Sequence, residues 1–241
     1  MKEYNLFAQY HDLIVRPDYD QLDDEVFFLN EVFEDFWNWK HILEAACWSW
    51  VVMKELINKW YDVKGFDLSE QMIKKSKDFY WLENTFVWDM RTYNSDEEFD
   101  IVLCNYNSIC HLLTFEDWVS FFKASYNNLK SWWILVFDIT TIYEFESLVE
   151  DFTLSKEIWD DTLCLSVEKR DSSYVRNVKM FQQAEDWRFD LFNETVSEAS
   201  FEIEKIKTEL ENYFKIETIV DYHNIEISEF SERVYFVARK I

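Results

Sequence analysis

Apolar and polar residues alternate along residues 41–140 in a regular rhythm of short buried runs and amphipathic stretches. The apolar runs predict strands at 41–46, 62–67, 85–90, 99–105 and 133–140. The stretches with apolar residues three and four positions apart predict helices at 19–36, 51–59, 69–80 and 115–129. Ser69 is placed to cap the third of these helices. Strands that alternate with helices predict a parallel sheet covered on both faces.

After Thr141 the rhythm changes. Short strands joined by polar turns are predicted at 163–169, 174–183 and 188–197, followed by a helix at 201–213 and strands at 215–222 and 233–240. We therefore expect one domain, built from residues 1–142 and 199–241, with an antiparallel β insertion at 143–198 that covers a substrate site. Right-handed crossovers place a ligand site at the carboxyl ends of the parallel strands, at the switch point after the first.

Composition adds one anomaly: the chain has one glycine and one proline against twelve tryptophans. Average usage of about 7% glycine predicts well over a dozen such residues in a chain of this length. A fold with this many turns needs positions with positive φ, which glycine adopts most easily. Tryptophan is therefore expected at some of these positions.

Charge and cysteine usage narrow the class of function. Against 24 basic residues stand 48 acidic ones, so the formal net charge is −24, and we expect no nucleic-acid partner. No apolar run reaches membrane-spanning length and residues 1–6 lack the pattern of a signal peptide, which predicts a cytoplasmic protein without a membrane partner. The four cysteines show no C-x-x-C spacing and are expected as reduced thiols. No histidine–carboxylate cluster indicates a metal site.

Acidic residues lie at or near the ends of the first three predicted strands: Glu44, Asp67 and Asp89. Glu44 precedes a tight turn into a helix, where the backbone passes close to a ligand and the helix offers free N–H groups. Asp67 can accept hydrogen bonds from both hydroxyls of a ribose, and Asp89 can accept one from the amine of an adenine. Any one of these acids is equally well explained as a helix cap or a solvated turn residue, but three in register favour a nucleotide-like ligand.

Longer motifs carry a resemblance to a known family. The segments LEAACWSW, DVKGFDLSEQM, FVWDMRTY, FDIVLCNYNSICHLL and LKSWWILVFD, with FAQYHDLI near the start and SERVYFVARKI at the end, span nearly the whole chain. Together they resemble class I S-adenosylmethionine-dependent methyltransferases that act on small molecules, in particular the deoxyaminosugar N-methyltransferase type. The resemblance implies a Rossmann-like, seven-stranded, mostly parallel sheet with helices on both faces and a small antiparallel β insertion. It also implies S-adenosylmethionine as cofactor and a small-molecule methyl acceptor, with a homodimer left open.

The resemblance also implies roles for particular residues. Glu44 and the backbone of Ala46, Cys47 and Trp48 would hold the methionine amino group, and Asn105 would lie behind the methionine group. The adenosine half would be met by residues of the second and third strand ends: Asp67, Leu68, Met72, Asp89 and Met90. Tyr10 would close the site and is a candidate catalytic residue together with His111, which would face the acceptor and could accept a proton from an amine. His111 is equally well explained as a residue that packs the start of a loop.

The chain departs from the family pattern wherever that pattern has glycine. Trp48 and Trp50 stand in place of the two loop glycines, and other tryptophans stand at further glycine positions: Trp37, Trp39, Trp60, Trp81, Trp88, Trp132 and Trp133. Such regularity indicates one systematic replacement of glycine by tryptophan. By contrast, Trp118 and Trp159 are interpreted as ordinary core or surface aromatics.

Three functions therefore remain. The first is methyl transfer from S-adenosylmethionine to a small-molecule amine or hydroxyl. The second is a catalytically impaired methyltransferase fold whose cofactor site is obstructed by Trp48 and Trp50. The third, a nicotinamide oxidoreductase, is weaker, because the G-x-G-x-x-G spacing is absent even after glycines are restored in place of the tryptophans.

Overall fold

The computed structural model describes residues 19–34, 40–48, 50–81, 83–151, 153–184, 188–223 and 225–241. Its helices are α2 (Tyr19–Glu34), α3 (Val51–Asn58), α4 (Glu70–Tyr80), α5 (Phe115–Asn128), α6 (Ile142–Asp151) and α7 (Ile203–Leu210), with a 3₁₀ turn η1 (Ser108–His111). Its strands are β1 (His41–Ala45), β2 (Asp62–Asp67), β3 (Thr85–Val87), β4 (Phe99–Cys104), β5 (Leu129–Thr140), β6 (Thr153–Ile158), β7 (Asp161–Arg170), β8 (Ser173–Gln183), β9 (Phe189–Glu198), β10 (Phe214–Asp221) and β11 (Arg233–Lys240).

Seven strands form the main sheet in the order β10-β11-β5-β4-β1-β2-β3. The pairs from β5 to β3 are parallel, whereas β11 runs antiparallel to both β5 and β10. The sheet is thus mostly parallel, as the alternation of strands and helices predicted. The strand order reverses at β1, which lies between β2 and β4, so the ligand site is expected at its carboxyl end.

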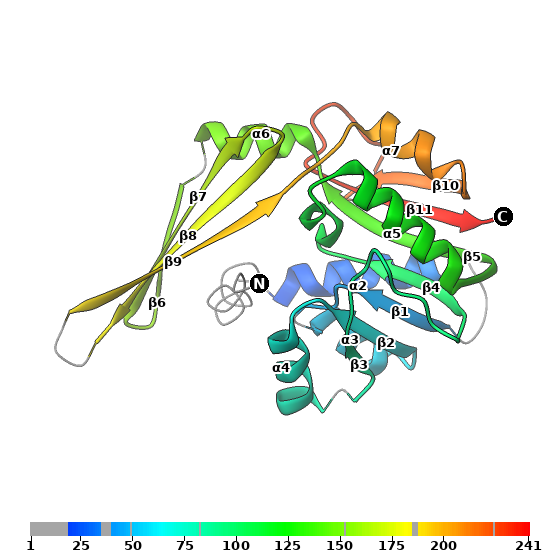
Figure 1. Ribbon diagram of the computed structural model, residues 1–241, viewed down its shortest axis with the longest axis horizontal. Helices are drawn as coiled ribbons and strands as arrows, with labels where there is room; N and C mark the ends of the chain where they lie inside the picture. The colour runs from blue at the N-terminus through cyan, green and yellow to red at the C-terminus, as the bar shows by residue number, and fades with distance from the viewer. Residues whose placement is uncertain are drawn as a thin grey trace.

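Period-two alternation along the central strands divides the core between the two faces of this sheet. Leu43 and Ala45 pack with side chains of α5 and α7 on one face, whereas Ile42 packs with side chains of α2 and α3 on the other. The same division holds along β4 and β5. The expected helical layers on both faces are present (Figure 1).

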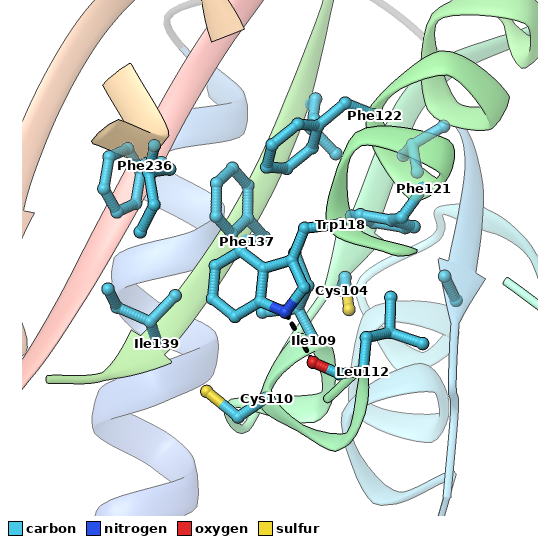
Figure 2. Close-up of a cluster of buried hydrophobic side chains, with 14 of the residues drawn as sticks. Cys104, Ile109, Cys110, Leu112, Trp118, Phe121, Phe122, Phe137, Ile139 and Phe236 are labelled. Atoms are coloured by element: carbon cyan, nitrogen blue, oxygen red, sulfur yellow. Dashed lines mark hydrogen bonds between the residues drawn. The ribbon is translucent and has the colours of Figure 1, made fainter. Parts of the chain in front are cut away.

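Trp118 anchors the larger of the two core clusters. Its indole is fully buried between α5 and the sheet, close to Phe122 and Phe137, and its Nε1–H donates a hydrogen bond to the carbonyl of Leu112 at 2.8 Å (Figure 2). A buried indole needs such a partner for its one polar group. The interpretation of Trp118 as a core aromatic is confirmed.

The insertion is a separate antiparallel sheet in the order β6-β7-β8-β9, which projects from the main sheet as a long arm (Figure 1). Its last strand returns to the site: the N–H of Ala199, just after β9, donates to the carbonyl of Cys110 in η1 at 2.7 Å. The sequence predicted three of these strands. It missed β6 and the preceding helix α6, because each presents only six to ten residues of mixed pattern between stronger signals.

Six of the ten residues with positive φ among the described residues are tryptophans: Trp48, Trp50, Trp60, Trp81, Trp132 and Trp159. Trp60 follows α3 and Trp81 caps α4, as predicted for positions that terminate helices. Trp159 is 80% exposed, which confirms its interpretation as a surface aromatic, and it also has φ 56° in the turn between β6 and β7, a conformation that the sequence analysis did not predict for it. Trp88 and Trp133 do not have positive φ, and Trp37 and Trp39 lie outside the described residues.

Candidate active site

A cavity of about 760 Å³ lies at the carboxyl ends of β1 and β2, where the topology predicts a ligand. Its wall is formed by residues of the β1 and β2 ends, α4, the segment after β3, η1 and the end of β9: Ala46, Trp48, Phe66, Asp67, Leu68, Ser69, Glu70, Gln71, Met72, Trp88, Asp89, Met90, Arg91, His111, Leu112, Leu113, Asp117 and Ser197. All five residues predicted to meet adenosine are in this wall. The insertion contributes Ser197 to this wall, and its covering of a substrate site stays a prediction.

Asp67 ends β2 and is almost fully buried. Its two carboxylate oxygens accept separate backbone N–H bonds, Oδ2 from Trp48 at 3.1 Å and Oδ1 from Ser69 at 2.8 Å. Burial raises the pKa of Asp67 to about 6, against the lowering effect of these bonds. Since an ionised carboxylate oxygen accepts about two hydrogen bonds, each oxygen keeps capacity for one ribose hydroxyl.

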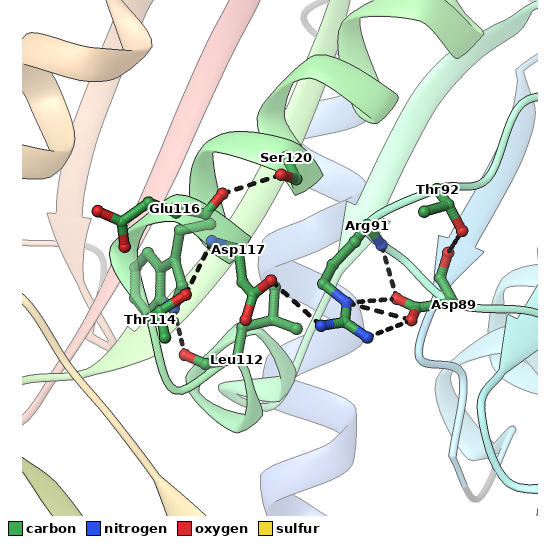
Figure 3. A network of polar contacts seen from close by, with 9 residues as sticks. Asp89, Arg91, Thr92, Leu112, Thr114, Glu116, Asp117 and Ser120 are labelled. Carbon is green, nitrogen blue, oxygen red and sulfur yellow. Dashed lines mark hydrogen bonds and ion pairs between the residues drawn. The ribbon is translucent and has the colours of Figure 1, made fainter.

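Asp89 lies two residues beyond the end of β3, which is shorter than predicted. The Arg91 guanidinium binds both oxygens of Asp89, through Nε at 3.0 and 3.1 Å and through Nη2 at 2.5 Å, and also reaches Asp117 of α5 at 3.1 Å (Figure 3). These bonds hold the pKa of Asp89 below its usual value. An adenine amine would therefore share Asp89 with Arg91, a residue that the sequence analysis did not single out.

Three described residues between β1 and α3 lie in the left-handed region of φ and ψ. Ala46, Trp48 and Trp50 have φ of 53°, 38° and 49°. Each such residue with a Cβ costs roughly 1–2 kcal/mol. Beneath the loop, the chain's one glycine, Gly65, serves close packing: a Cβ there would lie 3.0 Å from the Cβ and Sγ of Cys47.

The two loop tryptophans have different surroundings. Trp48 lines the cavity, stacks on His111 with ring centroids 5.7 Å apart, and packs against the apolar cluster of the insertion sheet. Trp50 is fully buried in the core cluster on the α2 and α3 face, with the Lys75 ammonium 5.3 Å from its ring, and does not line the cavity. Both tryptophans were expected to obstruct the site. In the structure only Trp48 lines the cavity, whereas Trp50 is buried in the core.

The residues predicted to hold the methionine group lie mostly outside the cavity wall. Ala46 and Trp48 border it, whereas Glu44, Cys47 and Asn105 are all at least 95% buried and do not line it. Asn105 accepts a hydrogen bond from Arg233 through Oδ1 at 3.3 Å, and its buried Nδ2 has no hydrogen-bond partner in the described part of the chain. The polar groups predicted for an amino-acid ligand are thus present in the chain but do not face this cavity, whereas Trp48 does.

His111 ends η1 and lies in the cavity wall beside Ser197. Burial lowers its pKa, while the Glu198 charge and a hydrogen bond to the Ser197 backbone act in the opposite direction. A histidine with a lowered pKa is neutral at pH 7 and keeps a lone pair for a proton. His111 thus both lines the cavity and packs against Trp48, and its catalytic role stays a prediction.

A buried charged cluster behind the site was missed by the sequence analysis. Arg233 of β11 donates to Asp138 of β5 at 2.6 Å and to both oxygens of Glu25 of α2 at 2.9 and 3.1 Å. It connects to the site through Asn105 and through Asn107, whose N–H donates to Asp138 at 2.8 Å. Nothing in the local sequence could indicate this cluster, because its members lie up to 208 residues apart.

Three further observations bear on the predictions. Tyr10, predicted both to close the site and to act in catalysis, lies outside the described residues. Within the described segments, no group of three or more His, Cys, Asp or Glu residues could hold a metal ion. The same segments contain no helix that is long and apolar enough to cross a membrane.

Comparison with known proteins agrees with this geometry. Residues 42–131 match the family described as methyltransferase domain. YqeM of Bacillus subtilis (strain 168), which carries the name of a methyltransferase, is 28% identical over 83% of each chain. An S-adenosylmethionine-dependent methyltransferase from Clostridium acetobutylicum ATCC 824 superimposes with a TM-score of 0.83 at 21% identity over 98% of each chain. The sugar N-methyltransferase KedS8 from Streptoalloteichus sp ATCC 53650 superimposes with a TM-score of 0.80 at 16% identity, over 95% of this chain and 92% of that one. Residues 42–131 therefore match a methyltransferase domain, and the chain has the fold of solved S-adenosylmethionine-dependent methyltransferases.

Proposed function

We propose that this chain transfers the methyl group of S-adenosylmethionine to an amine or hydroxyl of a small molecule. The observation that carries the proposal is the gathering of Asp67, Asp89 and His111 around one cavity at the strand ends. Asp67 and Asp89 serve the nucleoside end of the ligand, and His111 lies toward the insertion. Bound cofactor would supply an electrophilic methyl group, so the protein's part is to position the acceptor against it.

A small-molecule acceptor is consistent with the negative charge of the chain and with the enclosed cavity. A chain with a formal net charge of −24 repels nucleic acids, and the cavity is bounded by the insertion at Ser197. KedS8, which has the same fold, is described as a sugar N-methyltransferase. For an amine acceptor, His111 is the group that would take the proton, because its lowered pKa keeps it neutral at pH 7.

The second candidate is a methyltransferase fold without catalysis, and one observation favours it: Trp48 lines the cavity, whereas Glu44 and Asn105 do not. The residues present therefore fit the two halves of the cofactor unequally. Those predicted for adenosine line the cavity, and most of those predicted for methionine do not.

Calorimetry separates the two candidates. S-adenosylmethionine is titrated into the unsubstituted chain and into the Trp48→Gly variant, and methyl transfer to amine-bearing sugars is then measured with both. The proposed function requires binding and transfer by the unsubstituted chain. Binding and transfer by Trp48→Gly alone would support the second candidate, and binding of S-adenosylmethionine by neither folded protein would contradict the proposal.

A further inference from the structure

The cavity is lined by the residues predicted for one half of S-adenosylmethionine and by few of those predicted for the other half. Every residue predicted to meet adenosine lines it: Asp67, Leu68, Met72, Asp89 and Met90. Three of the five predicted to meet methionine do not line it: Glu44, Cys47 and Asn105. Trp48, in the loop that follows β1, is one of the two residues predicted to meet methionine that do line the cavity.

The Trp48 indole is held on two sides. One side stacks on His111, with an interplanar angle of 25°. Trp48 also packs against the apolar cluster of the insertion sheet, which includes Leu163, Val178 and Val196. A ligand in the cavity therefore meets Trp48, held by these contacts, and does not reach Glu44, Cys47 or Asn105, which do not line the cavity.

The nucleoside half keeps what a ribose and a purine require. Asp67 is fixed by two backbone N–H bonds and can accept a hydrogen bond on each oxygen. Leu68 and Trp88 are 46% and 45% exposed and lie in the cavity wall, so they present apolar surface to a flat ring. Trp88 is itself positioned by an edge contact with Tyr93, with ring centroids 5.5 Å apart.

We propose that this chain binds adenosine nucleosides with a small 5′ substituent, such as 5′-methylthioadenosine, in preference to ligands that carry the full amino-acid chain. The inference rests on the proposed function for the placement of adenosine. Trp48 thereby becomes the residue that determines specificity: it selects ligands by the length of their 5′ group.

The test is calorimetry with two probes, 5′-methylthioadenosine and S-adenosylhomocysteine, which differ in the amino-acid chain. Three proteins are compared: the unsubstituted chain, Trp48→Gly, and Trp60→Gly as a matched control. Trp60 also has positive φ but is 87% exposed and remote from the cavity wall, so its replacement relieves the backbone without opening the site. Thermal unfolding verifies that each protein is folded, and Trp48→Ala replaces the glycine variant if that variant is not.

We expect the unsubstituted chain and Trp60→Gly to bind the nucleoside at least about tenfold more tightly than S-adenosylhomocysteine. In Trp48→Gly this preference should be lost or reversed. Equal binding of both probes by the unsubstituted chain would overturn the inference and leave the proposed function standing. Binding of neither probe by that chain, while Trp48→Gly binds S-adenosylhomocysteine, would overturn the inference and support the second candidate function. Binding of neither probe by any of the folded proteins would overturn the proposed function as well.

Discussion

The indole of Trp48 and the imidazole of His111 are stacked, with centroids 5.7 Å apart. One ring comes from the loop after β1 and the other from η1 after β4, so the stack joins two strand ends across the switch point of the sheet. A glycine at position 48 would leave this space to a ligand. The stack therefore brings a tryptophan that stands in place of a family glycine into contact with His111, the candidate catalytic residue.

Replacing exposed tryptophans in the left-handed region with glycine should stabilise the fold. For Trp60, Trp81 and Trp159, which are at least 80% exposed, we expect a gain of about 1 kcal/mol each in the free energy of unfolding. The relief of positive φ, roughly 1–2 kcal/mol, exceeds the entropic cost of glycine, roughly 0.5–1 kcal/mol. Urea denaturation measures the change.

Two tryptophans without positive φ provide the controls for that series. Trp88→Gly, at a half-exposed site, should give no gain. Trp118→Gly should lose at least about 3–5 kcal/mol, because it removes a buried indole and its hydrogen bond to Leu112. Equal gains at Trp60 and Trp88 would show that backbone strain is not the cause.

His111 should set the acid limit of methyl transfer in the Trp48→Gly background. Because burial lowers its pKa, the rate should stay constant as the pH falls from 8 to the ordinary histidine value of 6.5 and decline only below it. Stopped assays of kcat across this range measure the profile. His111→Gln should reduce kcat by about a hundredfold for an amine acceptor. A decline at the same pH in His111→Gln would assign it to another group.

Nucleoside binding should weaken in acid through Asp67. Its pKa is about 6 in the folded chain, so the carboxylate is ionised at pH 8 and protonated at pH 5, where it loses an acceptor for a ribose hydroxyl. Calorimetry with 5′-methylthioadenosine should give a Kd about tenfold higher at pH 5 than at pH 8. Asp67→Asn should bind weakly at both pH values. A pH effect that persists in Asp67→Asn contradicts this assignment.

Arg233 should be essential for stability although no ligand contact is assigned to it. Its replacement by Met leaves Glu25 and Asp138 buried without their shared cation, and we expect a loss of about 3–5 kcal/mol on urea denaturation. The loss should be smaller at pH 5, because burial raises the pKa of Asp138 and protonation removes one of the two charges. Arg170→Met, which breaks an exposed pair with Glu168, should cost less than about 1 kcal/mol.

Local signals in the sequence were sufficient for most of the fold. Period-two alternation placed Ile42 and Leu43 on opposite faces of β1, and Ser69 caps α4 with its hydroxyl accepting from the Met72 N–H at 3.3 Å. Asp67 was predictable as a site residue because a strand end in a parallel sheet has a fixed relation to the ligand edge. In each case the position of the residue within its predicted strand or helix was sufficient to predict its place in the fold.

What the sequence alone determined is therefore most of the strand and helix order, the site edge and some of the positions with positive φ. Only the tertiary structure decided which side chains share a volume. Trp48 and Trp50 are two residues apart with similar φ, yet one indole meets His111 and the other enters the core. Their directions depend on surroundings supplied by α2, β9 and η1, elements distant in the chain. Backbone conformation is largely local, whereas packing is a property of the assembled fold, and this is why only the assembled fold shows that Trp48 lines the cavity and Trp50 does not.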